Sequence, residues 1–211
     1  MAGGGLFIAI EGFEGAGKTT RTKALQTAVR ERSDRRCEVV REPGGDPFAE
    51  ELRELLKASP HQITPWAEVF TFCAARANML ALKVKPLLEA GAVVISDRNY
   101  ISTVAYQGWG NHWPAAELER LRSVCSVAAQ VAPPDLTLVL NVAYETALQR
   151  LASRGEASDR FEARGQDYLR AVLDGYIKEA RLHNYPIIDG NQLPDKVDVA
   201  IWQEVKPHLL T

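Results

Sequence analysis

The feature that most constrains this chain is the octapeptide GFEGAGKT, which satisfies the pattern G-x-x-x-x-G-K-[ST] at every fixed position. A short apolar run, Leu6–Glu11, precedes it, and a helical pattern, Lys18–Arg32, follows it. In such a strand–loop–helix unit the glycines let successive backbone N–H groups point inward around an anion, and the helix N-terminus adds partial positive charge. The sequence therefore predicts a phosphate-binding loop, made of Gly12, Phe13, Glu14, Gly15, Ala16, Gly17, Lys18 and Thr19.

Specific side chains of this region can be assigned chemistry. We expect the ammonium of Lys18 to reach the β- and γ-phosphates of a bound nucleotide and the hydroxyl of Thr19 to ligate Mg²⁺. Asp97 ends an apolar run, where a carboxylate can support the same metal. Alone, such an aspartate is more often a turn former or a helix cap, but the complete loop favours the metal role. Because ligands bind outside the carboxyl ends of parallel strands, we expect Glu11, Glu42 and Asp97 to converge near the loop.

The rest of the chain alternates short apolar runs with longer helical patterns. Strands are predicted at Leu6–Glu11, Cys37–Glu42, Ala92–Asp97, Leu136–Val142 and Tyr185–Asp189, and helices at Lys18–Arg32, Pro65–Ala90, Pro114–Gln130 and Phe161–His183. Each parallel crossover needs a helix, and strands that are apolar throughout are buried on both faces. The pattern predicts an α/β fold: a three-layer α/β/α P-loop NTPase with a five-stranded parallel sheet.

One segment, residues 150–164, departs from this alternation. It is dense in Arg, Glu and Asp and poor in large apolar residues. Such a composition predicts a short, mobile, solvent-facing lid inserted into one domain that spans residues 1–211.

Composition excludes several other classes of protein. The 25 basic and 27 acidic side chains nearly cancel, whereas a general nucleic-acid binder needs a basic surface. No stretch approaches the ~20 apolar residues of a membrane span. The three cysteines, Cys37, Cys73 and Cys125, lack paired or metal-ligand spacing, which predicts free thiols in a reducing compartment. We therefore expect a cytoplasmic protein with no nucleic-acid or membrane partner.

Beyond the loop, several motifs in one order make the sequence resemble the thymidylate kinases along nearly the whole chain. They are FIAIEGFEGAGKTT, REPGG at Arg41–Gly45, FCAAR at Phe72–Arg76, DRNYISTVAYQG at Asp97–Gly108 and PDLTLVLNV at Pro134–Val142. The phosphate loop alone belongs to many families, but this combination is much narrower. The resemblance implies a nucleoside monophosphate kinase that uses ATP and Mg²⁺ to convert dTMP into dTDP, commonly as a homodimer.

The resemblance also implies how the acceptor base is recognised. Phe72 would stack on the thymine ring, and Arg76, one helical turn later on the same face, would donate to the carbonyl O4. Cytosine presents an amino donor at that position and would be disfavoured. Thr103 would contact the imide edge of the base. Taken alone, Phe72 fits a core aromatic and Arg76 a solvated helix residue; the surrounding motifs favour the binding roles.

The remaining acceptor residues follow from the same resemblance. Arg53 and Arg98 would hold the acceptor monophosphate, with Ser102 and Gln107 nearby. Tyr106 would crowd the ribose 2′ position and favour deoxyribose, although alone it fits a packing tyrosine. Pro43 would shape the pocket, with a cis bond before it. The residues assigned to the acceptor are Glu42, Pro43, Leu52, Arg53, Phe72, Arg76, Arg98, Ser102, Thr103, Tyr106 and Gln107.

The catalytic charge is expected to come from the lid. Some thymidylate kinases carry an arginine in the phosphate loop where this chain has Gly15, and the chain resembles the members that use lid arginines instead. A guanidinium is needed because negative charge spreads over the transferring oxygens. The resemblance assigns catalysis to Lys18, Arg98, Arg154, Arg160 and Glu14, and nucleotide binding to the loop with Thr20 and Arg150. Arg150 is expected to matter less to catalysis if it points to solvent. The chain departs from the family pattern in three places: Asn141 stands where the family often has aspartate, the lid is one residue longer at Arg154–Arg160, and Trp109–Asn111 lacks the arginine often found there.

Two other functions remain to be weighed. Another P-loop kinase would accept a wider range of deoxynucleotides or a deoxynucleoside; the latter would need no arginine clamp, and Arg53 and Arg98 argue against it. A nucleotide-dependent switch would have less need for a base-sized pocket. The motifs around Phe72 and Arg98 indicate such a pocket and therefore argue against a switch. Comparing the turnover of dTMP, dUMP, dGMP and thymidine distinguishes the first alternative from a thymidylate kinase. Acceptor-dependent ADP release distinguishes the second.

Overall fold

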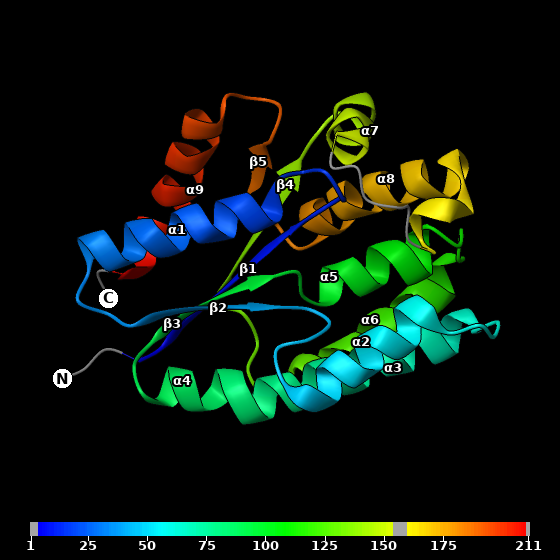
Figure 1. Ribbon diagram of the computed structural model, residues 1–211, viewed down its shortest axis with the longest axis horizontal. Helices are drawn as coiled ribbons and strands as arrows, with labels where there is room; N and C mark the ends of the chain where they lie inside the picture. Colours follow the sequence, from blue (N-terminus) through cyan, green and yellow to red (C-terminus); the bar gives the residue numbers. More distant parts are fainter. Residues whose placement is uncertain (1–3, 154–159, 210–211) are drawn as a thin grey trace.

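A computed structural model describes residues 4–153 and 160–209 of the chain. Its strands are β1 (Leu6–Gly12), β2 (Cys37–Arg41), β3 (Val93–Asp97), β4 (Leu136–Asn141) and β5 (Ile187–Asp189). They form one 5-stranded sheet in the order β2-β3-β1-β4-β5, with every neighbouring pair parallel (Figure 1). The predicted α/β fold with a five-stranded parallel sheet is confirmed.

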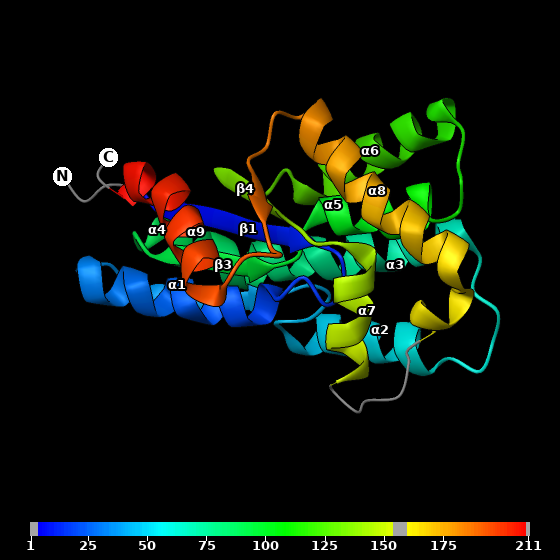
Figure 2. The same cartoon turned by 90° about the horizontal axis from the view of Figure 1, so that it is seen from above.

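The central strand shows why the sheet is covered on both faces. Leu6, Ile8 and Ile10 of β1 belong to a core cluster that also holds side chains of α1 (Lys18–Arg32) and α9 (Pro194–Leu209). Phe7, between them, belongs to a second cluster on the other face with Met79 and Leu80. Since successive side chains of a strand point to opposite faces, a run that is buried throughout needs helices on each side. Figure 2 shows α1 and α9 together on one side of the sheet.

The other helical elements carry most of the residues discussed below. They are α2 (Pro47–Ala58), α3 (Pro65–Met79), a π-helical turn η1 (Leu80–Val84), α4 (Lys85–Glu89), α5 (Tyr100–Thr103), a π-helical turn η2 (Val104–Trp109), α6 (Ala115–Ala129), α7 (Tyr144–Ala152), a 3₁₀ turn η3 (Glu162–Arg164) and α8 (Gln166–Leu182). Consecutive α3, η1 and α4 fill the predicted helix Pro65–Ala90, and the π-helical turn stands just before Pro86, which cannot donate a backbone hydrogen bond.

Helices α2, α5, α7 and α9 occupy segments for which the sequence patterns gave no helix. At α2 a local signal is present: Asp46 is the N-cap and accepts a hydrogen bond from Ala49 N at 3.2 Å, and Pro47 follows it. None of the helices in the described ranges is both long and apolar enough to cross a membrane.

Within segment 150–164, predicted to face solvent, Arg150 and Phe161 have partners inside the protein. Arg150 lies on α7 and donates to Gly15 O at 3.3 Å and to Gly190 O at 3.0 Å, so its guanidinium does not point to solvent. Phe161 is only 8% exposed and belongs to the core cluster of β1. Arg154 lies outside the described residues.

Candidate active site

The phosphate loop connects β1 to α1 at the carboxyl end of the sheet. Gly12, Gly15 and Gly17 have φ angles of 143°, 75° and 88°, which favour glycine. At Gly15 a β-carbon would also lie 2.6 Å from the carbonyl oxygen of Ala147 on α7. Both the backbone angle and this contact with main-chain atoms exclude an arginine at Gly15. Any guanidinium that faces bound phosphate must therefore come from elsewhere in the chain.

Lys18 is held inside the loop. Its Nζ donates to the carbonyl oxygen of Phe13 at 3.0 Å, and the residue is 7% exposed. Burial lowers the pKa of Lys18 to about 8, because desolvation disfavours the charged form. The ammonium lies inside the loop, where negatively charged phosphate oxygens would accept stronger hydrogen bonds from it than the neutral carbonyl of Phe13 does.

Thr19 and Asp97 meet as the sequence predicted. The Thr19 hydroxyl donates to Asp97 Oδ2 at 2.6 Å. Asp97 reaches this position because β3 pairs with β1, with Ile10 opposite Asp97. A hydroxyl and a carboxylate at this distance are hard oxygen ligands, which suit Mg²⁺ when phosphate and water complete the coordination. Within residues 4–153 and 160–209 no group of three His, Cys, Asp or Glu side chains could hold a metal without such help.

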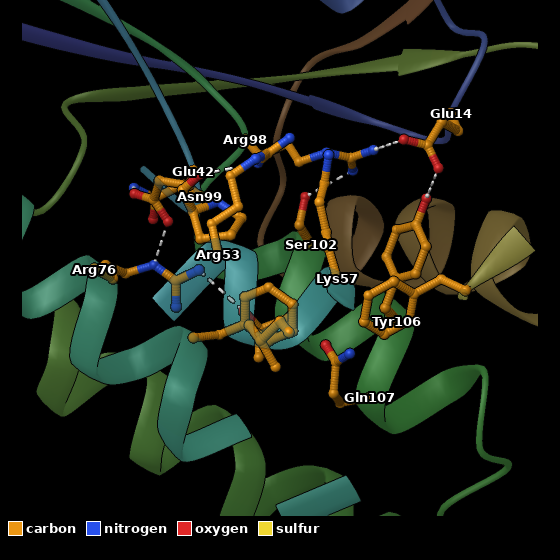
Figure 3. Close-up of a pocket in the computed structure, with 15 residues that line it drawn as sticks. Glu14, Glu42, Arg53, Lys57, Arg76, Arg98, Asn99, Ser102, Tyr106 and Gln107 are labelled. Atoms are coloured by element: carbon orange, nitrogen blue, oxygen red, sulfur yellow. Dashed lines mark hydrogen bonds and ion pairs between the residues drawn. The ribbon is translucent and has the colours of Figure 1, made fainter. Parts of the chain in front are cut away.

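Beside the loop lies a cavity that we call the aromatic cavity (Figure 3). It is lined by Glu14, Glu42, Pro43, Arg53, Leu56, Lys57, Phe72, Arg76, Arg98, Asn99, Ser102, Thr103, Tyr106, Gln107 and Phe161. A second one, the loop cavity, is lined by phosphate-loop residues with Thr19, Lys23, Arg41, Asp97 and others, and shares Glu14, Glu42, Arg53, Lys57 and Arg98 with the first. The two cavities therefore adjoin, and two arginines line both.

Arg98 is the best-connected side chain of the shared wall. Its Nη1 donates to Tyr176 OH at 2.7 Å, to Ser102 Oγ at 3.2 Å and to Gly12 O at 3.4 Å. Its Nη2 faces Glu14 Oε1 at 3.3 Å. The backbone of Arg98 has φ 78°, an unusual conformation for a residue with a side chain. Strain of this kind is often stored at functional sites.

The far end of the aromatic cavity contains a buried ion pair. Arg76 Nε donates to Glu42 Oε2 at 2.6 Å, and Arg76 Nη2 donates to Thr103 Oγ1 at 2.9 Å. Burial raises the pKa of Glu42, and the charge of Arg76 opposes that rise. The remaining nitrogen, Arg76 Nη1, is buried without a hydrogen-bond partner, as is Gln107 Oε1. A buried donor and a buried acceptor in one cavity wall indicate a ligand that supplies both partners.

Glu11 does not join Glu42 and Asp97 at the ligand side. Its carboxylate lies beneath the cavity and accepts from Asn99 N, Ser102 N and Ser102 Oγ at 2.9, 3.1 and 2.6 Å. Burial raises the pKa of Glu11 to about 7. Its contacts cap the first turn of α5, so Glu11 orders the strand-to-helix connection that carries Arg98.

Most of the other predicted residues lie where the sequence places them. Pro43 follows a cis peptide bond and accepts from Arg53 Nη1 at 2.9 Å. Leu52 is an exception, because it packs against the second core cluster while Leu56, one turn later, lines the aromatic cavity. Thr20 is exposed at the start of α1. Arg160 donates to Leu56 O at 2.9 Å and is absent from the residues that line either cavity.

Sequence reasoning missed several cavity residues. Lys57 and Asn99 line the aromatic cavity, and Asn99 donates to Glu42 Oε1 at 3.0 Å. Phe161 also lines it, with its ring centroid 6.1 Å from that of Phe72 and 6.0 Å from that of Tyr106. A large aromatic in an otherwise polar segment was the available signal for Phe161.

Comparison with known proteins agrees with this geometry. The family description "Thymidylate kinase" matches residues 10–201. A thymidylate kinase of Gluconobacter oxydans is 38% identical over 211 residues, covering 99% of this chain and 98% of that protein. One of Hahella chejuensis is 39% identical, covering 94% and 95%. One of Pseudomonas entomophila is 42% identical, covering 89% of each.

Proposed function

Since the chain belongs to the thymidylate kinase family, we propose how its residues move the γ-phosphoryl group of ATP onto dTMP, which yields dTDP and ADP. The loop cavity binds the phosphates of ATP, and the aromatic cavity binds dTMP. The observation that carries this assignment is the wall that both cavities share at Arg98 and Arg53, because phosphoryl transfer needs donor and acceptor phosphates side by side.

On the donor side, the loop backbone from Gly12 to Thr19 and the adjoining Thr20 hold the phosphates of ATP. Lys18 exchanges the Phe13 carbonyl for β- and γ-phosphate oxygens. Arg150 ties the Gly15 carbonyl to that of Gly190, so it shapes the nucleotide side of the loop from α7. The chemistry of Mg²⁺, when bound by Thr19 and Asp97, is to neutralise charge on the phosphates.

We expect Thr19→Ala to raise the Mg²⁺ concentration for half-maximal activity by about tenfold or more, because one oxygen ligand is lost. Chelation of Mg²⁺ should stop turnover by the parent. The measurement is initial rate against free Mg²⁺ at saturating ATP and dTMP. Thr27→Ala, an exposed threonine of the same helix, is the control. A Thr19→Ala enzyme with the parental Mg²⁺ curve would contradict the assignment.

On the acceptor side, the base lies against Phe72 with its polar edge toward Arg76, Thr103 and Gln107. Arg76 Nη1 supplies the missing donor for O4 of thymine, and Gln107 Oε1 supplies the missing acceptor for an N–H group. Glu42 and Asn99 fix the guanidinium of Arg76 from behind. A base with O4 and a protonated N3 satisfies both buried groups, whereas cytosine satisfies neither.

The remaining groups address the sugar and the phosphate. Tyr106 lines the cavity beside Glu14, with its hydroxyl 3.5 Å from Glu14 Oε2, and we propose that its ring crowds the ribose 2′ position. Arg53 and Arg98 clamp the acceptor phosphate, with Ser102 holding Arg98 in place. Pro43 and Leu56 shape the apolar rim around the ligand.

Charge that develops on the transferring phosphoryl group needs donors from the shared wall. Arg98 lies in that wall, Lys18 lines the adjoining loop cavity, and Glu14 positions Arg98 through their ion pair. Arg160 remains a proposed contributor on the resemblance to family members with lid arginines. Its guanidinium would have to leave Glu68, to which it is hydrogen-bonded at 2.5 Å, while Arg164 keeps its own hydrogen bond to that carboxylate.

Phe72→Ala should weaken dTMP binding by roughly ten- to a hundredfold, because stacking of a base on an aromatic is worth ~1–3 kcal/mol. The affinity for ATP should barely change, since Phe72 lines only the aromatic cavity. Calorimetric titration with each nucleotide measures both affinities, and Phe48→Ala, an exposed phenylalanine of α2, is the control. Equal losses for ATP and dTMP would show that Phe72 serves only the core.

The acceptor itself is tested with dTMP, dUMP, dCMP, dGMP and thymidine in one coupled assay. We expect dTMP to be best and thymidine to fail, because a nucleoside leaves Arg53 and Arg98 without a phosphate. Phosphorylation of thymidine at a rate comparable to dTMP would favour a nucleoside kinase. ADP release that ignores the acceptor would favour a nucleotide-dependent switch.

We also propose that residues 1–211 form one kinase domain that assembles as a homodimer in the cytoplasm. Phe70 of α3, Leu82 of η1 and Val127 of α6 are 58%, 68% and 65% exposed, which supports an apolar contact between copies. The three cysteines are buried and free, as suits a reducing compartment. One cooperative melting transition, a dimeric mass in solution and recovery in the cytoplasmic fraction are the expected results.

A further inference from the structure

Glu68 is a buried carboxylate that the assignments above leave without a role. It lies on α3 four residues before Phe72 and eight before Arg76, so the three side chains share one face of the helix. Glu68 is 0% exposed, whereas ordinary glutamates of a helix face solvent. A charge buried to this extent needs partners, and Glu68 finds them in two arginines that flank Phe161 and in the amide of Gln107.

The first two partners of Glu68 are arginines from the segment that precedes α8. Arg160 Nη2 and Arg164 Nη2 both donate to Glu68 Oε1 at 2.5 Å. Phe161 lies between them in sequence, and both guanidinium groups pack on its ring, at 5.3 and 5.0 Å from the centroid. One carboxylate therefore holds both ends of the short segment that carries Phe161 into the cavity.

The third partner is the amide of Gln107, which reaches into the cavity from η2 (Figure 3). Gln107 Nε2 donates to Glu68 Oε2 at 3.2 Å. An ionised carboxylate only accepts hydrogen bonds, so it fixes the NH₂ end of the amide toward α3. The carbonyl Oε1 is thereby left as the buried acceptor without a partner.

We propose that Glu68 is a positioning residue for the acceptor base: it sets the polarity of the Gln107 amide and holds Phe161 opposite Phe72. This inference rests on the proposed acceptor site. Arg76 then offers a donor and Gln107 an acceptor, a pair that fits O4 and the N3 proton of thymine or uracil. If the amide turned over, Gln107 would present NH₂, which suits the unprotonated N3 of cytosine instead. Glu68 thus discriminates between pyrimidines without touching them.

Glu68→Gln tests the proposal, because it keeps the shape of the side chain and removes its charge. A glutamine amide can accept from or donate to Gln107, so neither orientation of Gln107 is enforced. We expect KM for dTMP to rise about tenfold or more and the preference for dTMP over dCMP to fall by a similar factor. KM for ATP should stay at the parental value, since Glu68 does not line the loop cavity.

Glu179→Gln is the matched control. Glu179 is also 0% exposed, also holds an arginine (Arg122, at 2.7 Å) and also accepts from a side chain of η2, Trp109 Nε1, at 2.8 Å. Its partners Arg122 and Trp109 line neither cavity, whereas Gln107, the partner of Glu68, lines the aromatic cavity. We expect both variants to lose thermal stability and only Glu68→Gln to lose selectivity. An enzyme with Glu68→Gln that keeps the parental KM for dTMP and the parental selectivity overturns the proposal.

Arg164→Gln separates the two roles and serves if Glu68→Gln fails to fold. It weakens the anchor of Phe161 but leaves the contact between Glu68 and Gln107. KM for dTMP should rise while the preference for dTMP over dCMP stays unchanged, and an unchanged KM overturns the anchoring role. Failure of the proposed function would look different, because the parent itself would then not phosphorylate dTMP.

Discussion

Replacing Lys18 by methionine should lower kcat by at least about a hundredfold while the protein stays folded. Methionine keeps the volume of the buried stem and removes the ammonium that donates to Phe13 O. Since this cation faces the β- and γ-phosphates of ATP, its loss leaves developing negative charge without its nearest partner. The measurement is steady-state turnover of dTMP, with Lys85→Met, a solvent-exposed lysine of α4 that faces Glu89 at 3.9 Å, as control.

The same variant should change stability in a direction set by pH. Burial lowers the pKa of Lys18 from 10.5 to about 8. Between those two values the unfolded chain binds more protons than the folded one, so the free energy of unfolding of the parent rises with pH across this window. Lys18→Met should lack that rise and should be at least as stable as the parent at pH 7. Turnover at the parental rate would contradict the catalytic role of Lys18. A variant that is unfolded at pH 7 would contradict the inference that the buried charge destabilises the fold.

Local patterns placed the sheet and the phosphate loop correctly. Runs such as Val93–Asp97 are apolar because both faces of a parallel strand are covered, and that cause acts on every residue of the run. The ends of some predicted strands differed. The strand predicted at Tyr185–Asp189 is limited to Ile187–Asp189, because Pro186 has no backbone N–H to donate to a neighbouring strand. Helix α9 begins at Pro194 and its start could have been predicted, since proline favours the first turn of a helix.

The residues of the candidate site likewise include some that local motifs predict and others that only the fold brings together. Residues in contiguous motifs, such as Phe72 and Arg76, lie in the cavity as predicted because their helix carries them together. Glu68 and Phe161 were not predicted, since their roles depend on contacts between residues 92 and 96 positions apart, Glu68 with Arg160 and with Arg164. Arg150 was expected to matter less to catalysis if it pointed to solvent, but α7 packs beside the loop and directs it to Gly15. Pairings of this kind follow from the fold and have no local signature.

Arg98 presents the second large effect, because it stands where both cavities meet. Its Nη1 reaches a carbonyl of β1 and two hydroxyls, from Ser102 and Tyr176, while its Nη2 reaches a carboxylate of the loop. A lysine offers one compact ammonium on a flexible stem and cannot reproduce this forked arrangement. With an arginine, some nitrogens can keep the enclosing contacts while others turn to an acceptor phosphate.

We therefore expect Arg98→Lys to lower kcat/KM for dTMP by about a hundredfold or more, although the net charge is unchanged. Both kcat and KM should be affected, since the side chain lines the donor and the acceptor cavity and bears on ground state and transition state alike. Lysine also keeps a side chain at φ 78°, so the backbone strain is the same in both proteins, and any loss of thermal stability comes from the hydrogen bonds of the guanidinium. Arg120→Lys, on the exposed face of α6, gives the baseline for an arginine-to-lysine change away from the site. If Arg98→Lys keeps the parental kcat/KM, positive charge alone suffices at this position, and the forked geometry does not contribute to transfer.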